Sequence, residues 1–256
     1  MRAIAIHDDF TLVGPPAEVF RAYERFVALL AEAGLTLTTR KCRLLIPRHG
    51  EAPSPAIVDF VARTGVTLHE HSSMELLGGR VGTLDDDATK AWLHEQIMGH
   101  ERLFTALGSR HIKKQIAMLL LRSCGLPLLN FLVRVLPGRL MTQSARSFDQ
   151  RIEECFMQIT GIDAAEMKEA QKQFRLPIKF GGLGFRSYLR MLHACYVASF
   201  AMAIPRIALC PDGALLTPQQ DAVQHSLLRL RGQLHRHDEF TPPTLAGLFE
   251  TYRGTT

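Results

Sequence analysis

Two short apolar segments flank an acidic pair at the start of the chain. Ile4 and Ile6 alternate with alanines, and residues 10–13 are aromatic, β-branched or aliphatic. Both arms therefore have the composition of β-strands. The pattern predicts a β-hairpin whose tip carries His7, Asp8 and Asp9.

The pattern changes to helical spacing directly after this segment. Pro15 and Pro16 lead into a run of apolar residues three or four positions apart, and Gly34 follows as a helix C-cap. We expect a strand or strand pair over residues 35–46, and a second short helix that opens at Pro53 and Pro55. The apolar positions of the first helix are Val19, Tyr23, Phe26, Val27 and Leu30. The second helix is expected to end at Gly65, and residues 66–68 and 74–77 to form the arms of a further hairpin before Gly78 and Gly79.

From Asp85 onward the pattern is helical. Apolar residues up to Gly108 can form one stripe, and further helices are expected at about 110–123, 127–136, 143–160, 187–203 and 218–234. Breaks are expected at Gly125-Leu-Pro127, at Pro137-Gly138 and at Pro205, since Gly and Pro interrupt helices. The sequence therefore predicts an α+β protein in two parts, residues 1–84 with hairpins and packed helices, and residues 85–256 with helices alone.

The charge is unevenly distributed along the chain. The net charge is +5, but residues 51–100 carry 3 basic and 8 acidic side chains, whereas residues 101–150 carry 8 basic and 2 acidic ones. The basic side chains of this second block are Arg102, Arg110, Lys113, Lys114, Arg122, Arg134, Arg139 and Arg146. They could contact a phosphate backbone, or they could form an ordinary solvated helical face.

Composition narrows the class of protein. The hydrophobic content of 46% is typical of a globular chain. We expect no membrane span, because Arg122 and Arg134 interrupt the longest apolar runs, and no secretory leader, because His7, Asp8 and Asp9 fall where its apolar core would be. The five cysteines show no Cys-x-x-Cys pair, so an intracellular, reducing location is expected.

Asp8 and Asp9 admit two interpretations from the residues alone. Asp is common in turns because its carboxylate accepts hydrogen bonds from nearby backbone N–H groups. Alternatively, two carboxylates held close together repel each other unless a divalent cation lies between them. The second interpretation predicts a Mg²⁺ site at the tip of the hairpin.

Three motifs in order resemble the C-terminal half of a reverse transcriptase palm, most of all that of non-long-terminal-repeat retroelements. They are Ala5-Ile-His-Asp-Asp-Phe-Thr-Leu-Val-Gly14, Gly34-Leu-Thr-Leu-Thr-Thr-Arg-Lys-Cys42 and Leu76-Leu-Gly-Gly-Arg-Val-Gly82. The resemblance implies RNA-directed DNA polymerase activity in the parent protein, with Asp8 and Asp9 as catalytic ligands of two Mg²⁺ ions. It also implies nucleic-acid contacts at Lys41, at the Gly78-Gly79 hairpin and at Arg110, Lys113 and Lys114.

The helical part has its own likeness to retroelement polyproteins. Leu121-Arg-Ser-Cys-Gly-Leu-Pro-Leu-Leu-Asn130, Phe148-Asp149 and Leu176-Pro-Ile-Lys-Phe-Gly-Gly-Leu-Gly-Phe-Arg-Ser187 look like segments that follow the palm. The resemblance then makes residues 1–84 the C-terminal half of a palm and residues 85–256 a thumb-like and post-thumb region. An RNA/DNA duplex is the partner that it implies.

Two departures from the family pattern affect the expected activity. The family needs a further carboxylate from an earlier strand, and only seven residues precede Asp8. Ile6 and His7 stand where the family usually has an aromatic residue and Ala. We therefore expect this chain to lack polymerase activity by itself and to need a separate N-terminal polymerase portion, or to be an inactive remnant that still binds nucleic acid or protein.

Other motifs have simpler or competing explanations. The acidic pair also resembles the opening of a response-regulator receiver, in which Asp59 would be the phosphorylated residue. Gly181-Gly-Leu-Gly-Phe185 lacks the spacing of a dinucleotide-binding loop and predicts a turn between a strand-like segment and a helix. The alternating histidines of His69-Glu-His71 and His235-Arg-His237 show no third metal ligand and are expected to be solvated.

Overall fold

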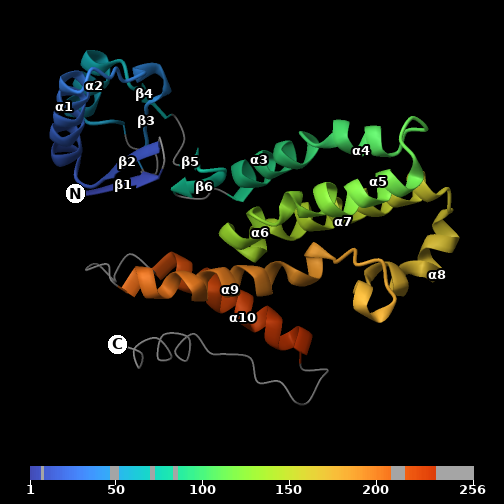
Figure 1. The fold of residues 1–256 in the computed structure, drawn as a ribbon. Coiled ribbons are helices and arrows are strands. Elements are labelled where there is room, and N and C mark those ends of the chain that lie inside the picture. The colour runs from blue at the N-terminus through green and yellow to red at the C-terminus, as the bar shows by residue number, and fades with distance from the viewer. Residues whose placement is uncertain (7–8, 47–51, 70–72, 83–85, 209–216, 235–256) are drawn as a thin grey trace. The chain divides into compact units, whose positions relative to one another are not determined.

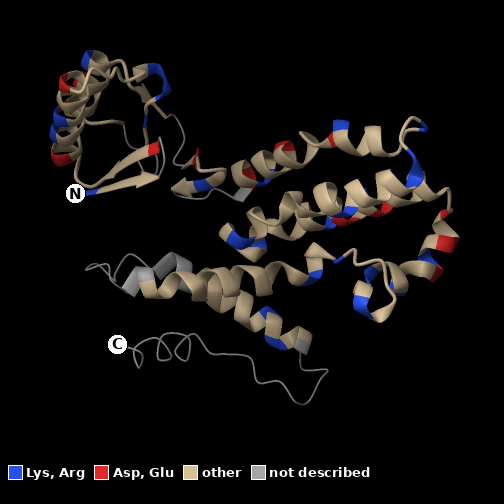
Figure 2. Ribbon diagram, in the orientation of Figure 1, with Lys and Arg blue, Asp and Glu red and all other residues tan. Residues whose placement is uncertain are grey.

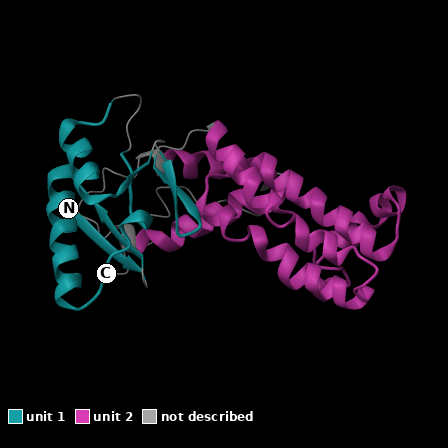
Figure 3. Ribbon diagram, turned by 90° about the horizontal axis from the view of Figure 1, so that it is seen from above, with its two compact units in different colours: residues 1–85 teal, residues 86–256 magenta. Residues whose placement is uncertain are grey.

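Strands and helices alternate in the first third of the chain, and helices alone follow in the part that the computed structural model describes (Figure 1). The described residues are 1–6, 9–46, 52–69, 73–82, 86–208 and 217–234. The chain divides into two compact units, residues 1–85 and residues 86–256 (Figure 3). The coarse α+β class expected from the sequence is confirmed.

The first unit opens with the expected hairpin and helix. Strands β1 (Arg2–Ile6) and β2 (Asp9–Val13) pair antiparallel, with Ile6 opposite Asp9. Helix α1 (Pro16–Glu32) follows. Gly34 ends it with a positive φ of 73°, and Leu35 N donates to Leu30 O at 2.8 Å. This is the glycine-ended helix terminus that the sequence predicts.

The segment between the first two helices differs from the prediction. Residues 35–38 form no strand, and the 3₁₀ turn η1 (Thr39–Lys41) and the short strand β3 (Arg43–Leu44) follow. The amides of Lys41 and Cys42 donate back to Thr38 O and Thr39 O, so these groups are not available to a sheet ladder. The expected strand over residues 35–46 is thus wrong except for two residues.

The second hairpin also uses a different partner from the expected one. Helix α2 (Pro55–Thr64) ends at Gly65 as predicted, and β4 (Thr67–Leu68) then pairs in parallel with β3. The hairpin consists of β5 (Ser73–Leu76) and β6 (Gly79–Gly82), with Leu76 opposite Gly79. Leu77 and Gly78 both have positive φ, which suits a two-residue turn between twisted antiparallel strands. The prediction that residues 66–68 form one of its arms is wrong. Strand β5 pairs instead with β6, which follows it directly along the chain through the two-residue turn.

The first unit has a small aromatic core. The ring of Phe60 on α2 stacks on Phe20 of α1 at a centroid distance of 4.0 Å and meets Tyr23 edge-on at 5.4 Å. On the β1–β2 hairpin, Phe10 stacks on Phe26 of α1 at 4.3 Å. Most large apolar residues of the hairpin nevertheless stay exposed, and α1 has no buried residue. These exposed residues are Ile4, Ile6, Phe10 and Val13.

The second unit is built around its longest helix, α7, which packs against α3, α4, α5, α9 and α10. Phe148 on α7 meets Phe104 and Tyr188 edge-on, at centroid distances of 6.1 and 5.6 Å. The elements of the unit are α3 (Asp86–Met98), α4 (Glu101–Leu107), α5 (Lys114–Leu120), the π-helical turn η2 (Leu121–Gly125), the 3₁₀ turn η3 (Leu126–Leu129), α6 (Leu132–Val135), α7 (Gly138–Thr160), α8 (Ala164–Arg175), η4 (Ile178–Phe180), α9 (Tyr188–Ala208) and α10 (Thr217–Leu234).

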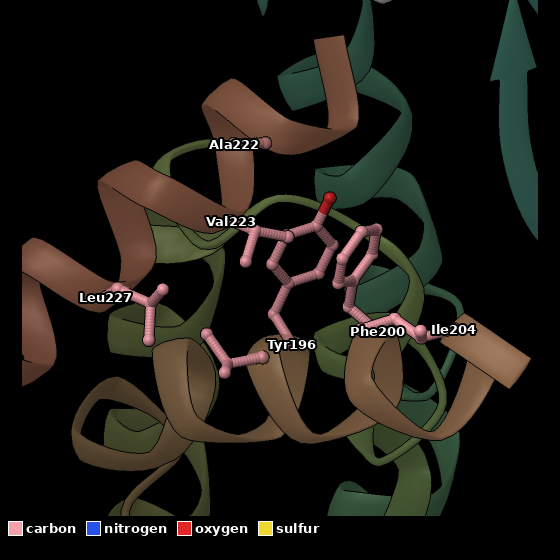
Figure 4. Packing of buried hydrophobic residues seen from close by; sticks show 7 residues of the cluster. Tyr196, Phe200, Ile204, Ala222, Val223 and Leu227 are labelled. Atoms are coloured by element: carbon pink, nitrogen blue, oxygen red, sulfur yellow. The ribbon is translucent and has the colours of Figure 1, made fainter. Parts of the chain in front are cut away.

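Helix α10 lies on α9 through a compact apolar cluster (Figure 4). Tyr196, Phe200 and Ile204 of α9 face Val223 and Leu227 of α10, and all five side chains are buried. The spacing of three or four residues on both helices places them on one face of each. Residues one turn earlier on α9 therefore also face α10.

Two of the predicted helix breaks are absent. The backbone stays helical through Gly125-Leu-Pro127, because η2 loosens the helix and Pro127 falls at the start of η3, where no intrahelical amide bond is needed. Pro205 lies inside α9, close to its C-terminal end at Ala208. The break at Pro137-Gly138 is confirmed as the start of α7.

One helix was not among those expected. Helix α8 begins at a capping box, in which Asp163 Oδ1 accepts from Glu166 N at 2.8 Å and Asp163 N donates to Glu166 Oε2 at 2.8 Å. The Asp-x-x-Glu spacing is a sequence signal for this start. Its own apolar stripe is short, with Met167 and Phe174 buried.

One helical stretch has the length and composition of a membrane span. Within the described residues it runs over Lys114–Val135, although Arg122 and Arg134 interrupt it as noted from the sequence. Of its most apolar window, 39% is buried inside the protein, and its elements α5 and α6 pack on α7 and α9. The stretch is thus partly packed on the other helices of its unit, while Ile116, Leu119, Phe131 and Val135 within it are exposed.

Candidate functional site

Asp9 lies at the end of the β1–β2 hairpin and is exposed. Asp8 and His7 lie outside the described residues. Among the described residues, no group of three or more His, Cys, Asp or Glu side chains is arranged to hold a metal ion. A Mg²⁺ ion requires near-octahedral oxygen coordination, and Asp9 alone supplies only part of it. The described residues thus provide one carboxylate for the expected metal pair and do not by themselves form a Mg²⁺ site.

Lys41, Gly78 and Gly79 fall elsewhere in the first unit. Lys41 is exposed at the end of η1 rather than in the expected strand. Gly78 is exposed in the turn of the second hairpin, and Gly79 is buried at the start of β6. In the described part of the chain, no hydrogen bond or ion pair connects Asp9 with Lys41 or with this turn.

Arg110 and Lys113 lie in the connection between α4 and α5, and Lys114 is the first residue of α5; Figure 2 shows basic residues in this connection. All three are exposed. Lys114 Nζ donates a hydrogen bond to Thr160 O, at the end of α7, at 3.0 Å. Lys114 therefore supports a helix terminus, whereas Arg110 and Lys113 extend the exposed basic surface.

Asp59 lies in the middle of α2, and its carboxylate accepts from Arg63 Nε at 3.2 Å. A receiver domain needs its phosphorylated aspartate at the end of a strand in a parallel sheet. The helical position and the antiparallel pairing of β1 with β2 do not fit that alternative.

The glycine-rich motif forms the predicted turn, but a 3₁₀ turn rather than a strand precedes it. Phe185 N donates to Phe174 O at 3.1 Å and thereby ties the turn to the end of α8. A Cβ atom on Gly182 would lie 1.9 Å from Leu176 O, so this position requires glycine. Of the histidine pairs, His69 is described, and its Nε2 lies 2.7 Å from Ser73 O; His71, His235 and His237 lie outside the described residues.

A buried polar junction that the sequence did not predict joins three segments of the helical unit, at Leu126–Asn130, at Asp149 and at Ser187–Leu189. Asp149 on α7 accepts from Ser187 Oγ at 2.6 Å, from Tyr188 N at 2.9 Å and from Leu189 N at 3.2 Å. Tyr188 Oη donates to Leu126 O at 2.6 Å and lies 2.5 Å from Asn130 Oδ1. Asp149 is thus the N-terminal cap of α9.

The ionisable groups of the junction are paired or neutral. Arg175 forms an ion pair with Glu153 and lies 4.0 Å from Asp149. Burial raises the pKa of Tyr188 to about 12, so the phenol stays protonated at neutral pH. With its donors and acceptors satisfied inside the protein, the junction supports the fold rather than a reaction.

A cleft with a volume of about 470 Å³ lies between α7, α9 and α10. It is lined by Arg139 and Thr142 of α7, by Leu192 and His193 of α9, and by residues of α10 that include His225 and Arg229. The sequence signal for a buried His193 is its helical spacing from Tyr196, Val197 and Phe200. The sequence does not indicate which helix covers His193, because its partner Ser226 on α10 is 33 residues away.

His193, which lines this cleft, forms a buried pair with Ser226. His193 Nδ1 lies 3.1 Å from Ser226 Oγ. Burial lowers the pKa of His193 to about 4, with repulsion from His225 and Arg229 adding to the effect. Ser226 is fully buried, and none of the described residues lining the cleft is a carboxylate that could orient the imidazole. The pair therefore lacks the access and the third group that a serine nucleophile needs.

Comparison of the chain with protein-family models, with curated proteins and with solved structures gives no match.

Proposed function

We propose that this chain is a portion of a retroelement reverse transcriptase, with a partial palm over residues 1–84 and a thumb-like region after it, and that by itself it binds nucleic acid without synthesising DNA. The observation that carries the proposal is the β1–β2 hairpin. Its register leaves Asp9 exposed at the start of β2, and an amphipathic helix, α1, follows that strand and packs on it. The hairpin supports the proposal because the family that the sequence resembles carries its Asp-Asp motif at the tip of a hairpin.

The second support is the electrostatic character of the helical unit. All eight basic residues between positions 101 and 150 are exposed. Exposed Lys and Arg neutralise backbone phosphates and release counterions, which provides affinity for a duplex without a catalytic metal. An intracellular location follows from this partner, and the proposal involves no membrane.

Duplex binding is tested by fluorescence anisotropy with an RNA/DNA duplex over a series of salt concentrations. The variant carries Arg110→Gln and Lys113→Gln, and the matched control carries Lys168→Gln and Lys172→Gln on the exposed face of α8. We expect the slope of log affinity against log salt to fall by about 2 in the variant and to stay unchanged in the control. The proposal of duplex binding would be contradicted if the chain had no affinity for the duplex at low salt. It would also be contradicted if the variant and the control changed the slope equally.

The polymerase part is tested separately with the purified chain. We expect no primer extension with Mg²⁺, because a complete two-metal site needs carboxylates beyond Asp8 and Asp9. Mn²⁺ used in place of Mg²⁺ should broaden the NMR signals of residues near the hairpin tip, and the double variant Asp8→Asn, Asp9→Asn should abolish this broadening. Primer extension by this chain, or broadening that survives in the variant, would refute this part.

A further inference from the structure

The cleft between α7, α9 and α10 has the composition of an anion site. Its polar lining consists of two guanidinium groups, Arg139 and Arg229, two imidazoles, His193 and His225, and the uncharged side chains Thr142 and Gln233. None of the described residues that line it is acidic. A surface that gathers cationic and neutral donors without a carboxylate favours an anionic ligand.

Two further observations point to an anionic ligand. The Nδ1 atom of His225 is buried and has no hydrogen-bond partner among the described residues. A buried polar atom without a partner costs free energy unless a bound group or water satisfies it. Burial lowers the pKa of His193 most, and repulsion from His225 and Arg229 lowers it further, which agrees with the cationic lining of the cleft.

The start of α7 adds to this potential. The helix begins at Gly138 beside the cleft, with no acidic residue in its first turn and no side-chain cap. A Cβ atom on Gly138 would lie 2.4 Å from His193 Nδ1, so the imidazole packs directly on the helix terminus because residue 138 is glycine. The positive end of the helix dipole favours negative charge at this place.

We propose that the cleft binds a phosphate group, with Arg139 and Arg229 as its ionic contacts and His225 as a hydrogen-bond partner. The cleft volume of about 470 Å³ exceeds that of a phosphate ion and falls in the range of small-molecule sites. The leucines beside it can pack against the carbon skeleton of a phosphomonoester or against a terminal nucleotide. The site is separate from Arg110 and Lys113, so it does not depend on duplex binding by that surface.

The test is isothermal titration calorimetry of the full chain with inorganic phosphate, followed by competition with an oligonucleotide that carries or lacks a 5′-phosphate. We expect saturable phosphate binding with a Kd below about 1 mM. Arg229→Gln should weaken it about tenfold, because a hydrogen bond between charged groups is lost, and Arg229→Lys should restore part of the affinity. Arg190→Gln, an exposed change on α9 outside the cleft lining, is the matched control and should leave the affinity unchanged.

The competition arm identifies the source of the phosphate. Displacement only by the 5′-phosphorylated oligonucleotide assigns the site to a nucleic-acid end, and failure of both oligonucleotides assigns it to a small phosphorylated molecule; both outcomes support the proposal. NMR of the His193 imidazole gives an independent readout, since a bound anion should raise its pKa from about 4. Non-saturable binding, or equal weakening by Arg229→Gln and Arg190→Gln, would overturn the proposal whether or not duplex binding is observed.

Discussion

Single polar side chains hold the helical unit together at points that no apolar pattern indicates. Asp149 is 7% exposed and accepts hydrogen bonds from one hydroxyl and two backbone amides at the start of α9. The buried carboxylate therefore replaces the intrahelical partners that the first amides of a helix lack. In the sequence, Asp149 belongs to the Phe148-Asp149 motif within a basic block, and nothing near it along the chain indicates that it caps α9.

Asp149→Asn should destabilise the protein by about 2–3 kcal/mol, because an amide cannot accept from all three donors and leaves one of them buried without a partner. Urea unfolding measures the effect. The same substitution at Asp163, the exposed cap of α8, should change the free energy of unfolding by less than about 0.5 kcal/mol, since Asn is also a good N-cap. An equal loss of unfolding free energy in both variants would show that the hydrogen bonds of Asp149 do not stabilise the protein more than an exposed cap does.

The free energy of unfolding should fall as the pH drops from 6.5 toward 4. His193 has a pKa near 6.5 when unfolded and about 4 when folded, so the unfolded chain binds the extra proton within this window. At pH 4 the free energy of unfolding should be lower by about 3 kcal/mol because of this residue, since each unit of pKa difference contributes about 1.4 kcal/mol. Urea unfolding at several pH values, compared with that of His193→Gln, isolates this contribution; parallel pH profiles for the two proteins would contradict it.

At the scale of elements, some helix ends follow from local sequence signals, whereas strand pairing depends on tertiary partners. The helix ends at Gly34 and Gly65 follow from backbone freedom within one turn, and both were predictable. The pairing of Thr67–Leu68 with Arg43–Leu44 depends on two segments that α2 brings together, and no local pattern encodes it. The capping box of α8 was a readable local signal beside a weak apolar stripe.

Gly182→Ala should destabilise the turn before α9 by more than about 1 kcal/mol, because the new methyl group overlaps Leu176 O and forces a backbone shift. Thermal unfolding followed by circular dichroism checks it. Gly232→Ala on α10 is the control of opposite sign: a Cβ atom there meets nothing within 4 Å, and Ala favours a helix by up to about 1 kcal/mol. An unchanged unfolding temperature in Gly182→Ala would contradict this prediction and show that the turn accommodates the methyl group.

At the scale of the whole molecule, the two units differ in how much apolar surface they bury. Among the described residues, the buried apolar side chains of the first unit are Ile57, Phe60 and Val66, whereas α7 alone buries more than these. Burial of apolar surface is the main stabilising contribution to folding. The first unit should therefore be the less stable one.

We expect unfolding in urea to show two transitions that separate the units. Trp92 on α3 is the single tryptophan of the chain, so its fluorescence reports on the second unit, while far-ultraviolet circular dichroism reports on the helices of both. Ellipticity should begin to fall at a lower urea concentration than the Trp92 signal changes. Coincident curves would show that the units unfold together.

The sequence by itself determined the β1–β2 hairpin, the starts and ends of α1 and α2, and the change to an all-helical chain near residue 84. These depend on periodicity and on turn residues, which act within a few positions along the chain. Tertiary structure alone decided the pairing of β3 with β4, the junction around Asp149 and the cleft around His193. Each of these joins residues that are far apart in sequence, and the free energy that selects them comes from burial and hydrogen bonding that exist only once the helices have packed.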